Sequence, residues 1–187
     1  MKKILSFLMV LVLICSSMLM LVACGGNGNG NGGGVSAEDI TLGSVAEKPE
    51  NYSEFSNEYI TFYYPSSWYF DDGMYGCSVV DVTTGTGINA RIPNHLSSES
   101  ADSFIEDLRN EQKETAPSPD ATVSEAVMIK ENVYTFDLSL NGQVATELII
   151  LSVDDDGKVV YYFEIGYSDR TDMQQLTTII NSIQFAN

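Results

Sequence analysis

Residues 134–165 of the 187-residue chain read YTFDLSLNGQVATELIILSVDDDGKVVYYFEI, and this stretch decides the fold. Apolar residues occupy every second position at both of its ends, namely Tyr134, Phe136, Leu138 and Leu140, and then Val159, Tyr161, Phe163 and Ile165. A period of two is typical of β-strands, whose successive side chains point to opposite faces. Asn141-Gly142 favours a two-residue hairpin turn, because both positions of a type I′ turn need positive φ, and 154–157 suits a longer turn. The stretch therefore predicts three consecutive antiparallel strands.

The middle strand of the three, expected over 144–153, carries the apolar run Leu148, Ile149, Ile150 and Leu151. A strand with such a run has no side suited to water, so we expect it to be central and covered on both faces. This favours a sandwich of helices and sheet over a sheet with one bare face.

Further strands are expected on the N-terminal side of this stretch. Glu131-Asn132 can join a strand over 121–130 to its successor, which gives a four-stranded antiparallel meander ending near Tyr167. Gly85 and Gly87 suggest another hairpin, between strands at 79–82 and 88–92.

The earliest strand has Ile60, Phe62 and Tyr64 on one face and is stopped by Pro65. The residues before it, up to about Ser56, are mostly polar. We expect them to form a lead-in with one short helical turn near 37–40, so that regular structure begins near Glu58.

Two helices complete the expected fold. The first begins near Ser98 or Ser100 and ends before Pro117 and Pro119; its apolar face is made by Ala101, Phe104, Ile105 and Leu108. The second begins with the capping box Thr171-x-x-Gln174 and has a longer apolar stripe, Met173, Leu176, Ile179, Ile180 and Ile183. The predicted class is α+β: an antiparallel β-sheet of about six to seven strands packed by helices as an α/β/α sandwich.

The N-terminus has the layout of a secretory signal, with Lys2 and Lys3, an apolar run over 4–22 and small residues before Cys24. Positive charge stays on the cytoplasmic side, so the remainder of the chain is expected outside. An uncleaved signal anchor is the alternative, because 4–22 is nearly as long as the roughly 20 residues that span a bilayer. Ser16 and Ser17 interrupt that run, which weakens this alternative.

The tetrapeptide Leu21-Val22-Ala23-Cys24 resembles the bacterial lipobox. The resemblance implies cleavage before Cys24 and attachment of diacylglycerol to its thiol, and two acyl chains suffice to hold a protein at a membrane. We therefore expect a signal peptide over 1–23, a lipidated cysteine with a tether over 24–34, and a single domain over 35–187. The expected location is the cell membrane, lipid-anchored, on its extracytoplasmic face.

The composition of the mature chain restricts its partners. The tether after Cys24 contains only Gly and Asn, which favours a flexible coil with a reach under about 20 Å. Cleavage would remove two lysines and no acidic residue, which changes the formal net charge from −17 to −19. Such acidity argues against nucleic-acid binding, which needs clustered Lys and Arg.

With Cys15 removed and Cys24 lipidated, Cys77 is the remaining thiol of the mature chain. We expect Cys77 to be a buried residue of a strand, and a reactive thiol is the alternative.

The segment 60–68, ITFYYPSSW, resembles the opening signature of the PsbP-like and DcrB-like domains, in which an aromatic strand ends in Tyr-Pro-Ser-x-Trp. The order of elements also agrees with that family, although the final Phe185 is displaced by two positions from the family's Ile-x-x-Ser-Phe ending. The resemblance covers nearly the whole domain and implies its fold. Members of this family are mostly accessory or assembly factors, extrinsic subunits or envelope lipoproteins, and no catalytic residue can be carried over from them.

Few residues suggest chemistry. His95 is the only histidine, so an ordinary zinc site or a cysteine–histidine pair is not expected, and His95 itself suits a solvated loop better than a general base. The neighbouring hydroxyls of Ser97 and Ser98 are better explained as helix-capping groups. Asp154 and Asp156 could offer oxygens to Ca²⁺ or Mg²⁺, although a polar hairpin turn is the simpler interpretation. No cofactor is expected.

Aromatic residues crowd the segment 59–75 and provide the candidate contact residues, Tyr63, Trp68 and Tyr69. Strand alternation places Tyr59 and Tyr63 outward or under a helix. The leading hypothesis is a non-enzymatic envelope lipoprotein that binds or steadies another membrane or exported protein. The alternative is a ligand-binding module that presents a small molecule or glycan to a membrane complex, and a hydrolase ranks third.

Overall fold

The computed structural model describes residues 34–73, 75–93, 100–116 and 118–186. The signal, Cys24, most of the tether, His95, Ser97, Ser98 and Pro117 lie outside the described residues, so the predictions made for them stay predictions. Within the described ranges, the helices are too short or too polar to cross a bilayer.

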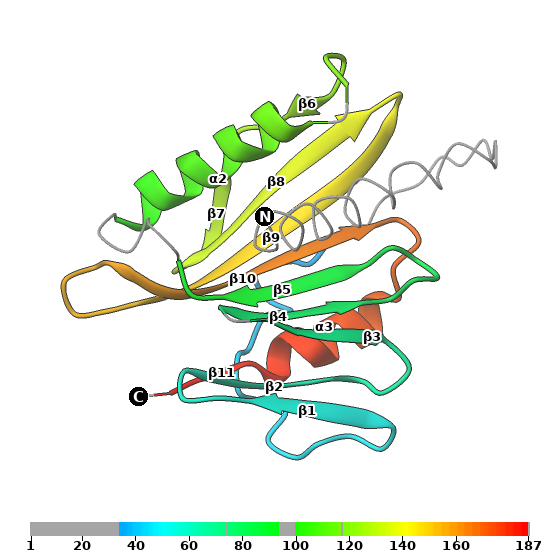
Figure 1. The fold of residues 1–187 in the computed structure, drawn as a ribbon, viewed down its shortest axis with the longest axis vertical. Helices are drawn as coiled ribbons and strands as arrows, with labels where there is room; N and C mark the ends of the chain where they lie inside the picture. Colours follow the sequence, from blue (N-terminus) through cyan, green and yellow to red (C-terminus); the bar gives the residue numbers. More distant parts are fainter. Residues whose placement is uncertain (1–33, 74, 94–99, 117, 187) are drawn as a thin grey trace.

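A large antiparallel sheet forms the body of the domain (Figure 1). Its strand order is β3-β4-β5-β10-β9-β8-β6, and β7 also pairs with β8. The strands are β3 (Tyr69–Gly73), β4 (Gly76–Val80), β5 (Gly87–Arg91), β6 (Thr122–Val123), β7 (Val127–Lys130), β8 (Val133–Leu140), β9 (Gln143–Val153) and β10 (Val159–Ser168). The predicted meander and the predicted hairpin of β4 and β5 are confirmed.

The turns of the meander have the backbone conformations that their residues predict. Asn141 and Gly142 have φ values of 53° and 79°, and they join β8 to β9 with Leu140 opposite Gln143. The turn over 154–157 ends with Gly157 at φ 78° and joins β9 to β10. Both turns therefore use positive φ where Asn or Gly is present.

The strand expected over 121–130 is wrong in one respect, because it is split into β6 and β7. At the break, the Ser124 hydroxyl accepts a hydrogen bond from the Asp137 backbone N–H at 2.9 Å, and the Ser124 N–H donates to the Asp137 carbonyl at 2.9 Å. A side-chain oxygen thus takes the place of a backbone acceptor, and regular pairing stops for three residues.

A second, three-stranded sheet has the order β1-β2-β11 and consists of β1 (Tyr52–Ser56), β2 (Ile60–Pro65) and β11 (Gln184–Phe185). Strand β1 corrects the expectation that regular structure begins near Glu58, since it pairs with β2 along its whole length. The expected helical turn near 37–40 is a simple turn. The lead-in also contributes to the core, because Ile40 is buried and its carbonyl accepts a hydrogen bond from the Lys130 ammonium.

The two helices are α2 (Ala101–Thr115) and α3 (Met173–Ser182). Helix α2 begins at the later of the two predicted starts, and its cap is Ser100, whose hydroxyl accepts from the Ser103 N–H. Asp172, not Thr171, caps α3 by accepting from the Gln175 N–H, because the Thr171 hydroxyl is already bonded to Thr86 at 2.7 Å and to the Ser168 N–H at 3.1 Å. The predicted cap is therefore shifted by one residue.

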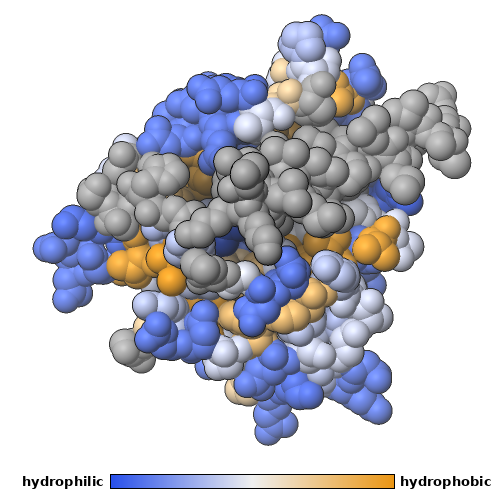
Figure 2. All heavy atoms as spheres, in the orientation of Figure 1, coloured by the Kyte–Doolittle hydropathy of each residue, from blue (hydrophilic) through white to orange (hydrophobic). Residues whose placement is uncertain are grey.

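Helix α2 covers one face of the large sheet, and the small sheet together with α3 covers the other (Figure 1). Hydrophilic residues gather on the outward side of α2 (Figure 2). Helix α2 packs on one face, where Phe104 meets Tyr162 with ring centroids 4.9 Å apart. On the other face, β2 and α3 share one core with the sheet, and Phe62 meets Phe163 at 5.4 Å. Neighbouring residues of β9 belong to different cores, Ile149 to the first and Ile150 to the second, so the strand is covered on both sides. The class α+β is confirmed, but the strands form sheets of eight and three and not one of six to seven.

Candidate functional site

The three aromatic contact candidates lie in different environments. Tyr63 and Trp68 are 7% and 9% exposed, whereas Tyr69 is 55% exposed. Tyr63 lies under α3, where its backbone N–H donates to the Ser182 hydroxyl at 2.9 Å and its own hydroxyl donates to the Ala46 carbonyl at 3.3 Å. Only Tyr69 therefore presents its ring to a partner.

Tyr69 begins β3, the edge strand of the large sheet. Within the described part of the chain β3 pairs only with β4, so its outer side has no strand neighbour. Asp71, Asp72 and Gly73 are exposed as well, and Tyr75 in the following turn is half exposed. Phe70 points the other way and stacks on Tyr64, with ring centroids 5.4 Å apart. The core therefore fixes β3 in place through Phe70, while the outer side of the strand remains without a paired strand.

Two carboxylates are buried on the α2 face of the large sheet. Glu147 of β9 is 2% exposed and Glu164 of β10 is 6% exposed. Glu147 lies opposite Gly166, and Glu164 lies opposite Ile149 on β9. A Cβ at position 166 would lie 3.0 Å from Oε1 of Glu147, so the absence of a side chain there makes room for the carboxylate.

Sequence reasoning missed this pair, although a signal was present. Glu147 is in phase with Ile149 and Leu151, and Glu164 is in phase with Tyr162, so period-two alternation places both carboxylates at buried positions. A charged residue in the buried phase of a central strand needs partners or a proton.

Glu164 is held by amides from two elements. The Gln112 side chain on α2 donates to Oε1 at 2.9 Å, and the Asn89 side chain on β5 donates to Oε2 at 3.5 Å. The Ser78 hydroxyl on β4 donates in turn to Oδ1 of Asn89 at 2.7 Å. With Asp71 opposite Ser78, the strand registers place four polar side chains in one row, from the exposed edge of β3 to the buried Glu164.

Burial raises the pKa of both carboxyl groups. For Glu147 the pKa lies well above its ordinary value of 4.5, and the negative charge of Glu164 raises it further. For Glu164 burial is again the largest cause; the Arg91 guanidinium and the two amides oppose this rise of the pKa, and the Glu111 carboxylate adds to it. Two carboxylates buried close together repel each other when both are ionised, so one of them, here Glu147, tends to keep its proton. Among the described residues no group of three or more His, Cys, Asp or Glu side chains could hold a metal ion.

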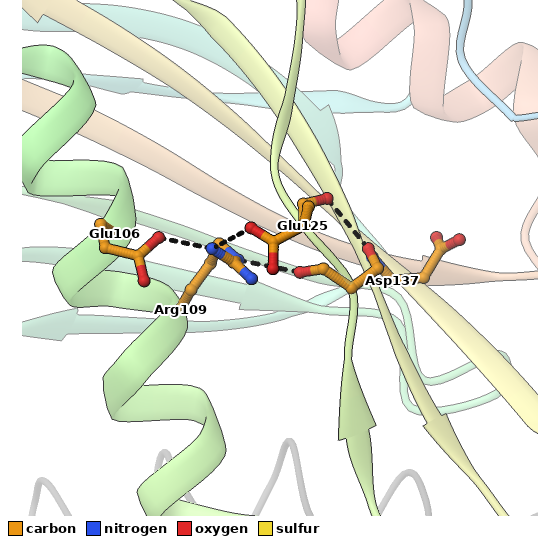
Figure 3. Close-up of polar contacts among 5 residues, drawn as sticks. Glu106, Arg109, Glu125 and Asp137 are labelled. Atoms are coloured by element: carbon orange, nitrogen blue, oxygen red, sulfur yellow. Dashed lines mark hydrogen bonds and ion pairs between the residues drawn. The ribbon is translucent and has the colours of Figure 1, made fainter.

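A second polar cluster joins α2 to the link between β6 and β7 (Figure 3). Its centre is Arg109, which is 2% exposed even though the pattern of α2 predicts only apolar buried residues. The guanidinium binds the carboxylates of Glu106 and Glu125 through Nη1, and its Nε donates to the Ser124 carbonyl at 2.8 Å. The long apolar stem packs in the interior while the charged end reaches carboxylates at the surface.

The remaining sequence candidates have structural roles. Oδ1 of Asp154 accepts from the N–H groups of Asp156 and Lys158, at 3.0 and 2.8 Å, so this carboxylate closes the hairpin turn. Cys77 lies buried in β4, which confirms the expected buried strand thiol, and burial raises the pKa of its thiol to about 12. A thiol of this kind supplies almost no thiolate at neutral pH.

No protein-family model matches the chain, and no curated protein matches it. The lipobox and the PsbP-like signature are therefore carried by the residues quoted above, and the assignments based on them stay predictions.

Proposed function

We propose that the chain is an exported bacterial lipoprotein, anchored by lipid on Cys24 at the outer face of the cell membrane, whose domain binds another protein of the envelope. The proposal of a lipid anchor rests on the order of three features in the first 34 residues: a signal-like apolar run, a lipobox-like tetrapeptide and a Gly/Asn tether. The point where the tether meets the domain supports it, since the Val35 N–H donates to the Tyr167 hydroxyl at 3.2 Å. The first described residues after the proposed tether, whose reach is under about 20 Å, are thus attached to β10 of the large sheet.

The open edge of β3 supports a protein partner. Exposed tyrosines are enriched where proteins bind one another, because the ring is rigid and largely apolar while its hydroxyl remains polar. Tyr69 and Tyr75 offer such rings beside an edge strand. The glycan alternative was centred on Trp68, which is buried and cannot stack on a sugar ring. The geometry therefore favours the protein partner over the glycan alternative.

The proposed family is that of the PsbP-like domains, with their α/β/α sandwich. Its support is the ITFYYPSSW signature together with two helices on opposite faces of an antiparallel sheet. The aromatic strand of this signature is β2, which lies in the small sheet beside the C-terminal helix. In this family the domain is mostly an accessory module, which agrees with a role in binding.

Photo-cross-linking in native membranes tests the binding role. A cross-linking amino acid at position 69 of the full-length lipoprotein should capture one recurrent envelope protein, and the same amino acid at the exposed Glu131 serves as the control. If position 69 captures nothing while a panel of glycans or solutes raises the melting temperature, the ligand-binding alternative replaces the proposal.

The anchor has its own test in Cys24→Ala. The variant should either be shed from the membrane fraction, because no acyl chain holds it, or remain there as the uncleaved precursor. A variant that is processed and still fractionates with membranes would contradict the lipobox assignment.

A further inference from the structure

We propose that the outer edge of β3 binds an extended, basic segment of the partner protein, which adds a strand to the large sheet. This inference rests on the proposed function and names the chemistry of its partner. Strand addition to an open edge gives affinity through backbone hydrogen bonds, while alternate side chains give specificity.

Strand β3 is the edge best suited to this role among the described strands. At the opposite side of the large sheet, β7 has four residues and an irregular register between Met128 and Lys130, which disrupts a continuous row of backbone groups. In the small sheet, β11 has two residues, and three of the five side chains of β1 are half-buried. Strand β3 pairs in regular register with β4 over all five of its residues, and four of these are exposed.

The edge is held in place before any partner arrives. Phe70 is fixed by its contacts with Tyr64 and with Phe55, whose ring centroid lies 5.9 Å away. On the neighbouring strand, Gly76 approaches β5 so closely that a Cβ would lie 1.9 Å from the Ala90 carbonyl oxygen. The backbone of β3 is therefore already ordered, so little conformational entropy is lost there when an incoming strand pairs with it.

Charge decides which kind of strand can pair there. Asp71 and Asp72 are both exposed on β3, and the chain as a whole carries a formal charge of −17. A second copy of β3 would bring the same two carboxylates against them, and like charges on paired strands are destabilising. Lys or Arg on the incoming strand would have the opposite effect. The acidic edge thus prevents pairing between copies and accepts a basic partner.

The test uses the full-length lipidated protein in a neutral detergent and an eight-residue peptide in which Lys and Val alternate. We expect this peptide to bind and to slow amide hydrogen exchange at residues 69–73. The same peptide with an N-methyl group on every residue has no backbone donor on either of its edges, and it should bind at least about tenfold more weakly. A Glu–Val peptide of equal length should not bind.

Matched variants separate the edge from general electrostatic attraction. D71N/D72N should weaken binding about three- to tenfold, as expected for two exposed charges. D155N/D156N removes the same charge from an exposed turn and should change binding less than twofold. Equal weakening by both variants, equal binding of the N-methylated peptide, or absence of slowed exchange at 69–73 would each overturn the inference. The proposed function survives such a result if position 69 still captures an envelope protein; if nothing is captured there while the Lys–Val peptide binds as expected, the proposed function fails separately.

Discussion

Replacing Glu147 by Gln should flatten the dependence of stability on pH. Gln has nearly the shape of protonated Glu but cannot lose a proton. Because burial raises the pKa of Glu147, the folded chain keeps this proton at pH values where the unfolded chain has lost it. The carboxyl group therefore contributes its full stability below its ordinary pKa of 4.5, and this contribution is lost as pH rises toward the folded pKa.

The size of the effect follows from proton linkage. Where the folded state binds one more proton than the unfolded state, the free energy of unfolding falls by about 1.4 kcal/mol for each pH unit. The wild-type curve should approach this slope above pH 4.5 and become level above the folded pKa. Glu147→Gln should remove most of it. A smaller slope should remain from Glu164, because burial also raises the pKa of that carboxyl group while Arg91 and two amides oppose the rise.

Urea unfolding followed by the fluorescence of Trp68, the only tryptophan, measures both slopes. Titration from pH 5 to pH 8 starts above the ordinary pKa of 4.5, where the slope should appear, and avoids precipitation near the sequence pI of about 4.1. Glu131→Gln, in an exposed turn, is the matched control and should run parallel to the wild type. If the Glu147→Gln curve is also parallel to the wild type, burial does not raise the pKa of this carboxyl group and the reasoning is refuted.

Three further predictions concern packing around the same sheet. Arg109→Ala should lower the free energy of unfolding by about 1–3 kcal/mol, because the bonds that join α2 to the β6–β7 link are lost. Lys113→Ala, on the exposed side of α2, is the control and should cost under about 0.5 kcal/mol in the same urea titration. Gly166→Ala should destabilise the fold by about 1–2 kcal/mol, because the new Cβ crowds the buried Glu147 carboxylate. Gly87→Ala, where a Cβ meets nothing within 4 Å, should cost less. Equal melting temperatures for the two variants would contradict this placement of the carboxylate. In a C15S/C24S variant, where Cys77 is the only thiol, that thiol should resist a thiol reagent at pH 8 and react at once in urea, because burial raises its pKa to about 12. Rapid labelling without urea would show that the thiol is accessible.

Much of the sheet could be predicted because its signals are local. Alternation over 134–165 marked the three long strands, and the Asn141-Gly142 pair marked their first turn. The apolar stripes of α2 and α3 were likewise readable, because a helix repeats its faces every 3.6 residues. Strand β1 escaped notice because its five residues include only two large apolar side chains, and pairing with β2 is what orders it.

The candidate surfaces depended more strongly on the tertiary structure. Tyr63, Trp68 and Tyr69 look alike in the sequence, yet only Tyr69 is exposed, because α3 and the core cover the other two. Arg109 and Glu164 occupy buried phases of their elements, but the groups that bind them include Ser124 and Asn89, which are distant in the sequence.

The type and order of most elements and the acidic charge could be read from the sequence, since each of these depends on residues that are neighbours along the chain. The export signal read from the same sequence stays a prediction. The close approach of two buried glutamates and the position of β3 at an edge became known only from the folded structure. The physical reason is that burial and pairing arise from residues brought together by the fold, and the energy of a buried charge depends on those neighbours rather than on its own identity.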